Sequence, residues 1–289
     1  MKALFFRYFQ PGSIVAILAV WYSIPASWLK VTWFPTVASI ATVAMVQLLE
    51  FVNERHASWR INRRELLTDV FYVILFFYGV TTVEAILFDD PLAAAKESLG
   101  ITNSWVGSLP FVAQVGLTLF VFEFGQYWMH RLMHNSLLWW THAPHHHITQ
   151  LNALKGFVGN PLELLLISIG VTALLDVPAN ATFCSFNILA AVASFAHANV
   201  RFNPPRWYSY IFTTIETHSL HHRLGFIETR CNYANALILL DHVFGTYHEG
   251  ESTVVGQDGR KRLTIAEQWL FPLRPCMAWR RARSASTPG

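Results

Sequence analysis

Long apolar segments recur along this 289-residue chain, and several approach the roughly 20 residues that an α-helix needs to cross a bilayer. They lie at residues 13–29, 31–52, 69–88, 109–129, 161–177 and 181–199. Only 13% of the residues are charged, whereas soluble globular domains carry about 25%. The sequence therefore predicts an all-α integral membrane protein with about four to six membrane helices. It excludes a disordered chain, a disulfide scaffold and a nucleic-acid binder led by charge.

The first and the last of these segments need separate interpretation. The first follows Lys2 and Arg7, as a signal peptide would, but no small-residue cleavage site follows it and the next apolar segment begins almost at once. We therefore expect it to be retained as a membrane helix. The last two segments are joined by a short turn around Pro178 and Asn180. This turn predicts a tight helical hairpin that either crosses the bilayer or dips into it.

Charged residues between the segments predict their orientation, because Lys and Arg accumulate in cytoplasmic loops. The loop at residues 53–68 carries four arginines, whereas the loop after residue 88 carries three acidic residues and one lysine. This difference places the first loop inside and the second outside, so that residue 130 and everything after residue 200 face the cytoplasm. The predicted fold is a membrane bundle with a helical, histidine-rich cap on its cytoplasmic side.

Histidine is the residue type with the most uneven distribution. The chain has 13 histidines, and all except His56 lie between His130 and His248. One pair has the spacing i, i+4, and two groups of three share the spacing i, i+3, i+4. On a helix, each of these spacings directs its imidazoles into one small volume. The three motifs are His130 and His134; His142, His145 and His146; and His218, His221 and His222.

These motifs predict a metal centre, since neutral imidazole is the commonest metal ligand at physiological pH. A solvated histidine-rich loop would explain any single motif. It does not explain why two motifs repeat one spacing, or why all three face the same side of the membrane. Eight nitrogen donors exceed what one tetrahedral ion uses, so two ions are expected. His197, at the end of the last apolar segment, is expected to be a further ligand.

Acidic residues near the motifs are candidates for holding the ligands in place. Glu123 lies two helical turns before His130, where its carboxylate is expected to accept a hydrogen bond from the far nitrogen of a ligand. Glu163, Glu216 and Asp241 are candidates for the same role, because ionisable groups in or beside membrane segments are costly and tend to be functional.

Other polar residues have alternative roles. Asn199 is expected to bind metal directly or through water, and Glu84 to pack between helices or line a cavity. His56 is expected to take no part. Three further histidines are expected to support the centre or to be solvated: His147, His242 and His248.

The rest of the sequence defines three regions. Cys184, Cys231 and Cys276 form no CxxC pair, which argues against a disulfide framework or a thiolate metal site. The segment 263–283 mixes aromatic residues with arginines, which is typical either of an amphipathic helix at the lipid headgroups or of a packed terminal helix. We expect N-terminal membrane helices and loops at 1–108, a catalytic domain at 109–250 and an amphipathic tail at 251–289.

The order of these motifs resembles the histidine boxes of the fatty acid hydroxylase and sterol desaturase superfamily of membrane di-iron proteins. The resemblance runs from Glu123 to Thr246, and its supporting matches are Tyr127-Trp128, His197-x-Asn199, Asn232-Tyr233 and the closing DHVFGT of residues 241–246. The chain departs from the family pattern at three positions: Glu123 where Asp is common, Ile215 where Pro is frequent, and His242 where Arg is common.

The resemblance implies two iron ions held by the histidines, with O2 as co-substrate. Zinc can replace iron in purified protein, because nitrogen-donor sites bind Zn²⁺ more tightly than Fe²⁺. The resemblance also implies a lipid substrate from the bilayer. Electrons would come from a separate electron-transfer protein, which could be a cytochrome b5-like protein, a ferredoxin or a reductase. No nucleic-acid partner is expected.

We therefore predict a di-iron enzyme that hydroxylates an unactivated C–H bond of a fatty acyl, sterol or other membrane lipid. The nearest alternative is a desaturase with the same site, since both reactions begin with abstraction of a hydrogen atom. A histidine-rich metal transporter is a remote alternative, because transport sites lie near the bilayer midplane rather than at helix ends. A non-catalytic metal-dependent scaffold is the other remote alternative.

Overall fold

The computed structural model describes residues 1–135, 137–170 and 172–274. Within these residues the regular secondary structure is entirely helical, and strand-like pairing is limited to two isolated bridges, Glu54 with Val200 and Arg223 with Val255. The predicted all-α fold class is therefore confirmed. The predicted tail is described only as far as Arg274, and the rest of it, including Cys276, lies outside the described residues.

The α-helices are α1 (Lys2–Ser23), α2 (Ala26–Leu29), α3 (Phe34–Glu50), α4 (Arg63–Ile74), α5 (Thr81–Glu84), α6 (Asp90–Ser98), α7 (Phe111–Met133), α8 (Trp139–His146), α9 (Pro161–Ser168), α10 (Ala179–His197), α11 (Arg206–Ile211), α12 (Ile215–His221), α13 (Leu239–Val243) and α14 (Ile265–Leu270). Two π-helical segments are η2 (Leu75–Val80) and η3 (Ala85–Asp89). Short 3-10 turns are η1 (Ala57–Trp59), η4 (Ser104–Ser108), η5 (Lys155–Phe157), η6 (Thr172–Leu174), η7 (Asp258–Arg260) and η8 (Phe271–Leu273).

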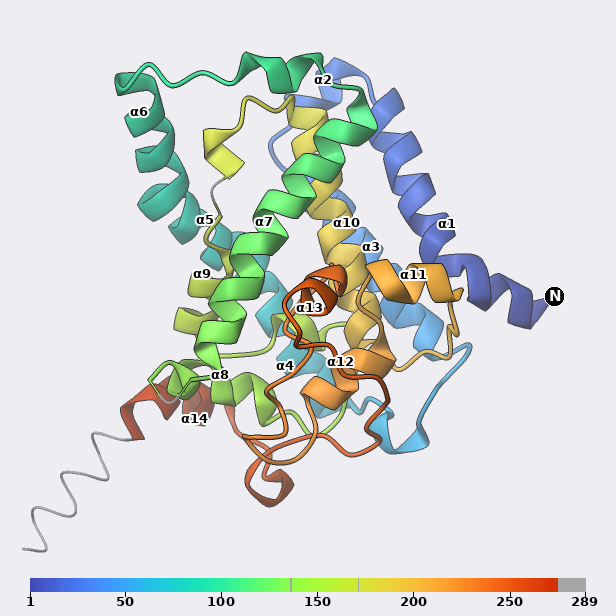
Figure 1. The fold of residues 1–289 in the computed structure, drawn as a ribbon. Coiled ribbons are helices and arrows are strands. Elements are labelled where there is room, and N and C mark those ends of the chain that lie inside the picture. Colours follow the sequence, from blue (N-terminus) through green and yellow to red (C-terminus); the bar gives the residue numbers. More distant parts are fainter. Residues whose placement is uncertain (136, 171, 275–289) are drawn as a thin grey trace, which may run out of the picture.

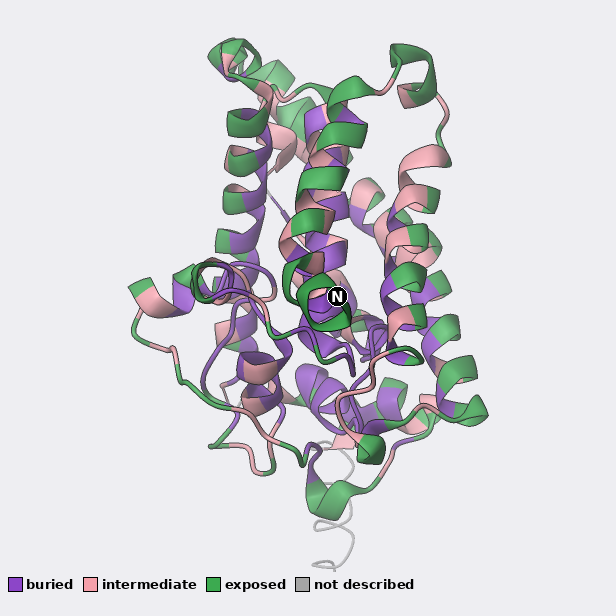
Figure 2. Ribbon diagram, turned by 90° about the vertical axis from the view of Figure 1, so that its right-hand side faces the viewer, coloured by how far each residue is buried: buried purple, intermediate pink, exposed green. Residues whose placement is uncertain are grey.

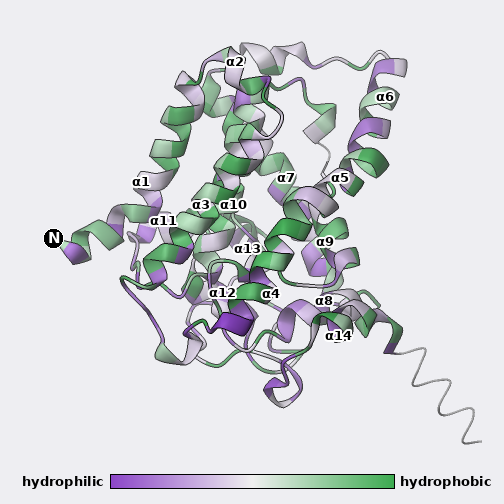
Figure 3. Ribbon diagram, turned by 180° about the vertical axis from the view of Figure 1, so that it is seen from behind, coloured by the Kyte–Doolittle hydropathy of each residue, from purple (hydrophilic) through white to green (hydrophobic). Residues whose placement is uncertain are grey.

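Among the described residues, three helices are long and apolar enough to cross a bilayer: α1, the continuous helix Arg63–Ser98 that contains α4 to α6, and α10. α10 is the most central of them, with 61% of its apolar window buried against 22% for each of the other two, and it packs against α1, α3 and α7. Figure 2 shows that the outward faces of the long helices are exposed, and Figure 3 shows many apolar residues along them. Apolar exposure of this kind is expected of helices whose solvent is lipid.

Two of the predicted membrane segments have different bounds in the structure. The first helix begins at Lys2 rather than at residue 13, with Pro11 inside it, and Figure 1 shows that its N-terminal part turns away from the bundle. A proline removes one backbone hydrogen bond and bends a helix, which accounts for the change of direction. The third helix begins near residue 63 and continues to residue 98. The π-helical segments η2 and η3 join α4, α5 and α6 into this one continuous helix.

The segment predicted at 161–177 is not one long helix. α9 has only 8 residues, and the backbone of Ile169 is already extended. The chain then passes close to α7, where a Cβ atom on Gly170 would lie 2.8 Å from the ring of Phe122. Glycine permits this close approach. The hairpin therefore pairs a short helix with the long helix α10.

A polar cap lies at one end of the bundle, where α8, α12, α13 and α14 gather (Figure 1). A buried ion-pair network joins it to α4. Lys155 in the cap is 2% exposed, and its ammonium lies 2.5 Å from Glu65 and 2.7 Å from Asp69 of α4. Asp69 also accepts a hydrogen bond from Asn152. A buried charge needs such partners, so this network fixes the cap relative to the membrane helices.

Candidate metal centre

Nine buried histidines from four helices come together where the bundle meets the cap. They form two groups, in each of which the possible ligand atoms all lie within 4.8 Å of one another. Cluster A contains His130, His134, His142, His146 and His221, and cluster B contains His145, His197, His218 and His222. The structure thus brings together every histidine that the sequence predicts as a metal ligand.

Each three-histidine motif is divided between the two clusters. In α8, His142 and His146 belong to cluster A and His145 to cluster B. In the α12 motif the assignment is reversed, with His218 and His222 in cluster B and His221 in cluster A. The expectation that each motif fills one small volume was therefore wrong. Successive residues of a helix turn by about 100°, so positions i+3 and i+4 point to different sides, and one helix serves two neighbouring sites.

Backbone and carboxylate oxygens fix the orientation of several rings. Nδ1 of His130 lies 2.5 Å from the carbonyl oxygen of Tyr233, and Nδ1 of His221 lies 2.7 Å from that of Cys231. In cluster B, Nδ1 of His145 lies 2.7 Å from the carbonyl oxygen of Val158. A carbonyl oxygen can only accept, so each Nδ1 carries the proton and donates. Nε2 of each neutral ring is then left with a lone pair.

The Nε2 atoms face one another at short distances. Nε2 of His130 lies 2.9 Å from Nε2 of His142 and 3.0 Å from Nε2 of His221, and Nε2 of His218 lies 3.0 Å from Nε2 of His197. The donation from Nδ1 leaves no hydrogen between the Nε2 atoms of His130 and His221. Their two lone pairs therefore repel each other unless a cation lies between them.

Protonation of these histidines does not relieve the repulsion at neutral pH. Burial lowers the pKa of His142 to about 3, and it lowers the pKa values of His146 and His221 well below the ordinary histidine range. A metal ion fits instead, because two nitrogens bound at a right angle with bonds of about 2.1 Å lie roughly 3.0 Å apart. The donor set of both clusters therefore fits a metal ion.

Glu163 supports cluster A directly. Its Oε1 accepts from Nδ1 of His142 at 2.8 Å, and its other oxygen accepts from the backbone N–H of Asn160 at the start of α9. A Cβ atom on Gly159 would lie 2.2 Å from that second oxygen, so a larger residue there would displace the carboxylate from this position. Similarly, a Cβ atom on Gly156 would lie 3.2 Å from Nδ1 of His197. The sequence reasoning missed both glycines.

The role expected for Glu123 needs correction. Its Oε2 accepts from the backbone N–H groups of Ala236 and Leu237 rather than from a histidine. Asp241 likewise accepts from the backbone N–H of Tyr233 at 2.8 Å. Because the carbonyl of Tyr233 holds the ring of His130, both acids shape the loop that orients this histidine. A backbone acceptor has no side-chain signature, so the sequence could not indicate it.

Asn199 and Glu216 also differ from expectation. The side chain of Asn199 accepts from the backbone N–H of His56 at 2.8 Å and donates to the carbonyl of His56 at 2.9 Å. Glu216 pairs with Arg55 at 2.8 Å rather than with a histidine. Both side chains connect the 53–56 loop to the cap, because Asn199 forms hydrogen bonds with His56 of this loop and Glu216 forms an ion pair with Arg55. Of the remaining histidines, His242 stacks on the ring of Tyr247.

An apolar cavity of about 370 Å³ leads from the bundle to both clusters. His130 and His142 of cluster A and His145 and His197 of cluster B line one part of it. Six phenylalanines are among its other lining residues: Phe76, Phe77, Phe122, Phe157, Phe183 and Phe186. Glu84 also lines the cavity, which is one of the two roles expected for it. The cavity is of the size and apolar character of small-molecule sites.

Comparisons with known proteins agree with the histidine motifs. Residues 115–246 match the fatty acid hydroxylase family. An ornithine lipid hydroxylase of Rhizobium tropici is 29% identical over 264 residues, which are 86% of this chain and 78% of that protein. A delta(7)-sterol-C5(6)-desaturase of Nicotiana tabacum is 32% identical over 166 residues, 52% of this chain and 58% of that protein. The resemblance predicted from the motifs is therefore confirmed.

A more distant relative covers less of the chain. An alkylglycerol monooxygenase of Homo sapiens is 30% identical over 139 residues, which are 46% of this chain and 31% of that protein. No solved structure matches the chain significantly.

Proposed function

We propose that this protein, whose residues 115–246 match the fatty acid hydroxylase family, is an O2-dependent di-iron enzyme that hydroxylates an unactivated C–H bond of a membrane lipid. The observation that carries the proposal is the pair of histidine clusters, in which Nε2 atoms face each other at about 3 Å beside an apolar cavity. Relatives that hydroxylate, desaturate or monooxygenate lipids support an oxidoreductase.

The chain's own residues would bind and orient the two irons. Cluster A offers five nitrogen donors and cluster B four, with rings fixed by Glu163 and by the carbonyls of Tyr233, Cys231 and Val158. Iron bound there would supply the reduction of O2 and the oxidation of C–H, in which RH, O2, two electrons and two protons give ROH and water. Imidazole suits several metals, so the identity of iron rests on the family.

The phenylalanine-lined cavity would bind the apolar part of the substrate and exclude water from the reacting carbon. Four histidines from both clusters line this cavity, so an apolar chain inside it would lie next to the metal centre. A substrate lipid entering from the bilayer would keep its polar group nearer an interface. The ornithine lipid relative matches over 78% of its length, which makes lipids with an amino-acid headgroup the first class to test.

We further propose a multi-pass membrane protein with the cap and the active site on the cytoplasmic side. The four arginines at residues 53–68 support this orientation, since their loop packs against the cap through Asn199 and Glu216. The domain division at 1–108, 109–250 and 251–289 remains part of the same proposal. A separate electron-transfer protein would supply the electrons.

Desaturation is the second candidate, and the sterol desaturase relative favours it. The two reactions share the site and differ in the fate of the carbon radical. Product analysis separates them, since a hydroxylated lipid gains one oxygen atom whereas a desaturated lipid loses two hydrogens.

The test uses the full chain, purified under reducing conditions with iron. His134→Ala removes a donor from cluster A, His218→Ala removes one from cluster B, and His248→Ala is the matched control outside both clusters. We expect both cluster variants to lose product and bound metal while the control keeps both. Full metal content and activity in the two cluster variants would refute the site.

A further inference from the structure

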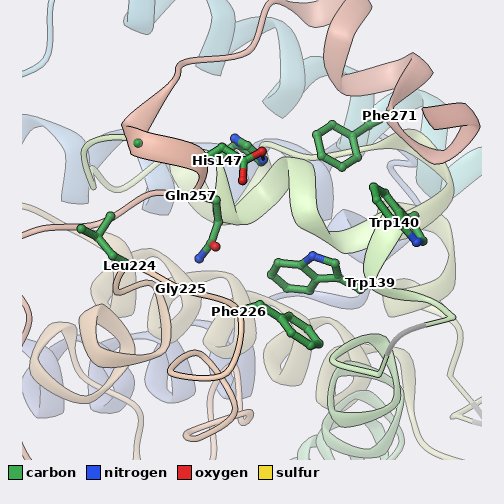
Figure 4. Close-up of a pocket in the computed structure, with 10 residues that line it drawn as sticks. Trp139, Trp140, His147, Leu224, Gly225, Phe226, Gln257 and Phe271 are labelled. Carbon is green, nitrogen blue, oxygen red and sulfur yellow. Dashed lines mark ion pairs between the residues drawn. The ribbon is translucent and has the colours of Figure 1, made fainter. Parts of the chain in front are cut away.

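A second cavity, of about 440 Å³, opens on the cap. Trp139 and Trp140 of α8 line it together with Phe226 and Phe271 (Figure 4). No cluster histidine lines this cap pocket, whereas four line the apolar cavity in the bundle. The two cavities therefore approach the clusters from different sides.

Trp139 lines the cap pocket and also packs against two histidine rings of cluster A. Its ring centroid lies 5.3 Å from that of His134 and 5.1 Å from that of His146, and Phe226 packs against it at 4.7 Å. Neither His134 nor His146 lines the apolar cavity. An indole in contact with two candidate ligand rings gives a short path of conjugated groups from the cap surface to the metal centre.

Basic residues lie beside the cap pocket, as does the carboxylate of Glu228, which lies close to the lining residue Gly225. The guanidinium of Arg274 lies 3.9 Å from the centre of the Phe271 ring, and that of Arg230 lies 5.9 Å from the Phe226 ring. Arg223 and Arg260 flank the lining segments and donate to backbone carbonyls. Within the described residues, none of these four arginines forms an ion pair with a carboxylate. Their charge is therefore available to a partner.

The interior of the cap pocket does not suit a phosphate-bearing cofactor. Its ionisable lining groups are Asp258 and His147, whose Nε2 lies 3.5 Å from the Asp258 carboxylate. That carboxylate would repel a phosphate inside the pocket, whereas the guanidiniums of Arg230 and Arg274 lie over the aromatic rings that line it. An aromatic centre flanked by these arginines fits a protein with an acidic face, because opposite charges steer association and an aromatic patch excludes water.

We propose that the cap pocket is the docking site of an acidic one-electron carrier protein and that Trp139 bridges this carrier to cluster A. This inference rests on the proposed function. Each docking event oxidises one reduced carrier by one electron and reduces the metal centre by one electron. Two events supply the two electrons of one hydroxylation, and the two protons come from water. Electrons and lipid then reach the centre from separate sides.

The experiment uses the full iron-loaded chain in lipid nanodiscs and a reduced plant-type [2Fe–2S] ferredoxin as the acidic carrier. Oxidation of the ferredoxin is followed by anaerobic stopped-flow absorbance. The double variant Arg223→Glu/Arg230→Glu should raise the half-saturating ferredoxin concentration at least about tenfold at low salt. High salt should remove this difference by screening. Arg206→Glu, an exposed arginine on α11, is the matched control and should behave as the wild type.

Trp139→Leu should lose most of the transfer rate at saturating ferredoxin without a change in metal content, and Trp139→Phe should restore part of this rate. Trp140 lines the same pocket, but its indole packs against Phe271 and contacts no cluster histidine. The Trp140→Leu variant should therefore keep the maximal transfer rate. Unchanged maximal transfer in Trp139→Leu would overturn the bridge. Equal effects of the Arg206→Glu and double variants would overturn the docking site.

Two further measurements separate the possible causes of failure. Dithionite is a small reductant that needs no docking site, and it should reduce the metal in every variant at the wild-type rate. If the chain held no metal that dithionite could reduce, the proposed function, rather than the docking site, would be contradicted. A chain ending at Arg274 should bind ferredoxin as the full chain does. Tighter binding by the shortened chain would mean that the C-terminal segment occupies the pocket, and the docking proposal would be wrong.

Discussion

Glu163→Gln should weaken one metal site and leave the other intact. In the metal-loaded protein the nearby cations favour the ionised carboxylate, so the change removes a negative charge that accepts from Nδ1 of His142 at 2.8 Å but keeps the size of the side chain. His142 belongs to cluster A, and the hydrogen bonds of Glu163 reach no member of cluster B. The loss of metal affinity should therefore be confined to the ion in cluster A.

The size of the effect follows from the bond that is weakened. A hydrogen bond to a charged group contributes about 1.5–3 kcal/mol. Replacing a residue that holds a metal-bound histidine lowers metal affinity about 10–100-fold, which agrees with that energy because each factor of ten is about 1.4 kcal/mol. Because Glu163 is 3% exposed, solvent screens this interaction little.

The assay is metal content after dialysis against increasing concentrations of a chelator. Glu163→Gln should release about one metal per chain at a chelator concentration 10–100-fold below that needed for the wild type, and the second metal should leave as in the wild type. Glu216→Gln is the matched control, since Glu216 pairs with Arg55 and contacts no histidine. Parallel loss of both metals from Glu163→Gln, or equal curves for the two variants, would refute the reasoning.

Three other predictions test the surrounding structure. Lys155→Met leaves two α4 carboxylates without their buried partner and should lower the free energy of unfolding by about 3–5 kcal/mol; an unchanged melting temperature would contradict this. Gly156→Ala places a Cβ atom 3.2 Å from Nδ1 of His197 and should weaken metal binding, measured by the same dialysis, without lowering the helix content seen by circular dichroism. In the metal-free protein, burial lowers the folded pKa of His142 from 6.5 to about 3. The unfolded chain then binds protons first, so thermal stability should fall as the pH drops below about 6.5; a stability that rises on acidification would contradict the shift.

The sequence predicted eight of the nine candidate ligands because their spacing is a property of side chains on helices, and His197 because it ends the last apolar segment. The division of His142 and His145 between two clusters depends on how α8 faces α7, α10 and α12, and the spacing alone carries no information about that packing. Glu163 and Glu216 were equivalent candidates in the sequence. Only the fold places one against a histidine and the other against Arg55.

The membrane segments show a similar limit. The lengths of the apolar segments predicted α10 and the existence of α1. The residues at which the membrane helices begin and end, however, depended on contacts between distant residues. α9 ends at Ser168 although apolar residues continue, and the chain then packs a glycine against Phe122. The carbonyls of Tyr233 and Cys231 could not be anticipated either, since any residue type provides the same acceptor.

The central claim is that the two histidine clusters support O2-dependent oxidation of a lipid. The most direct measurement is mass spectrometry of membrane lipids after incubation with the iron-loaded full chain, a reduced carrier protein and ¹⁸O2. One lipid class should gain a single ¹⁸O atom, and His134→Ala and His218→Ala should abolish this gain. No labelled lipid, from a protein that holds two reducible irons, would contradict it.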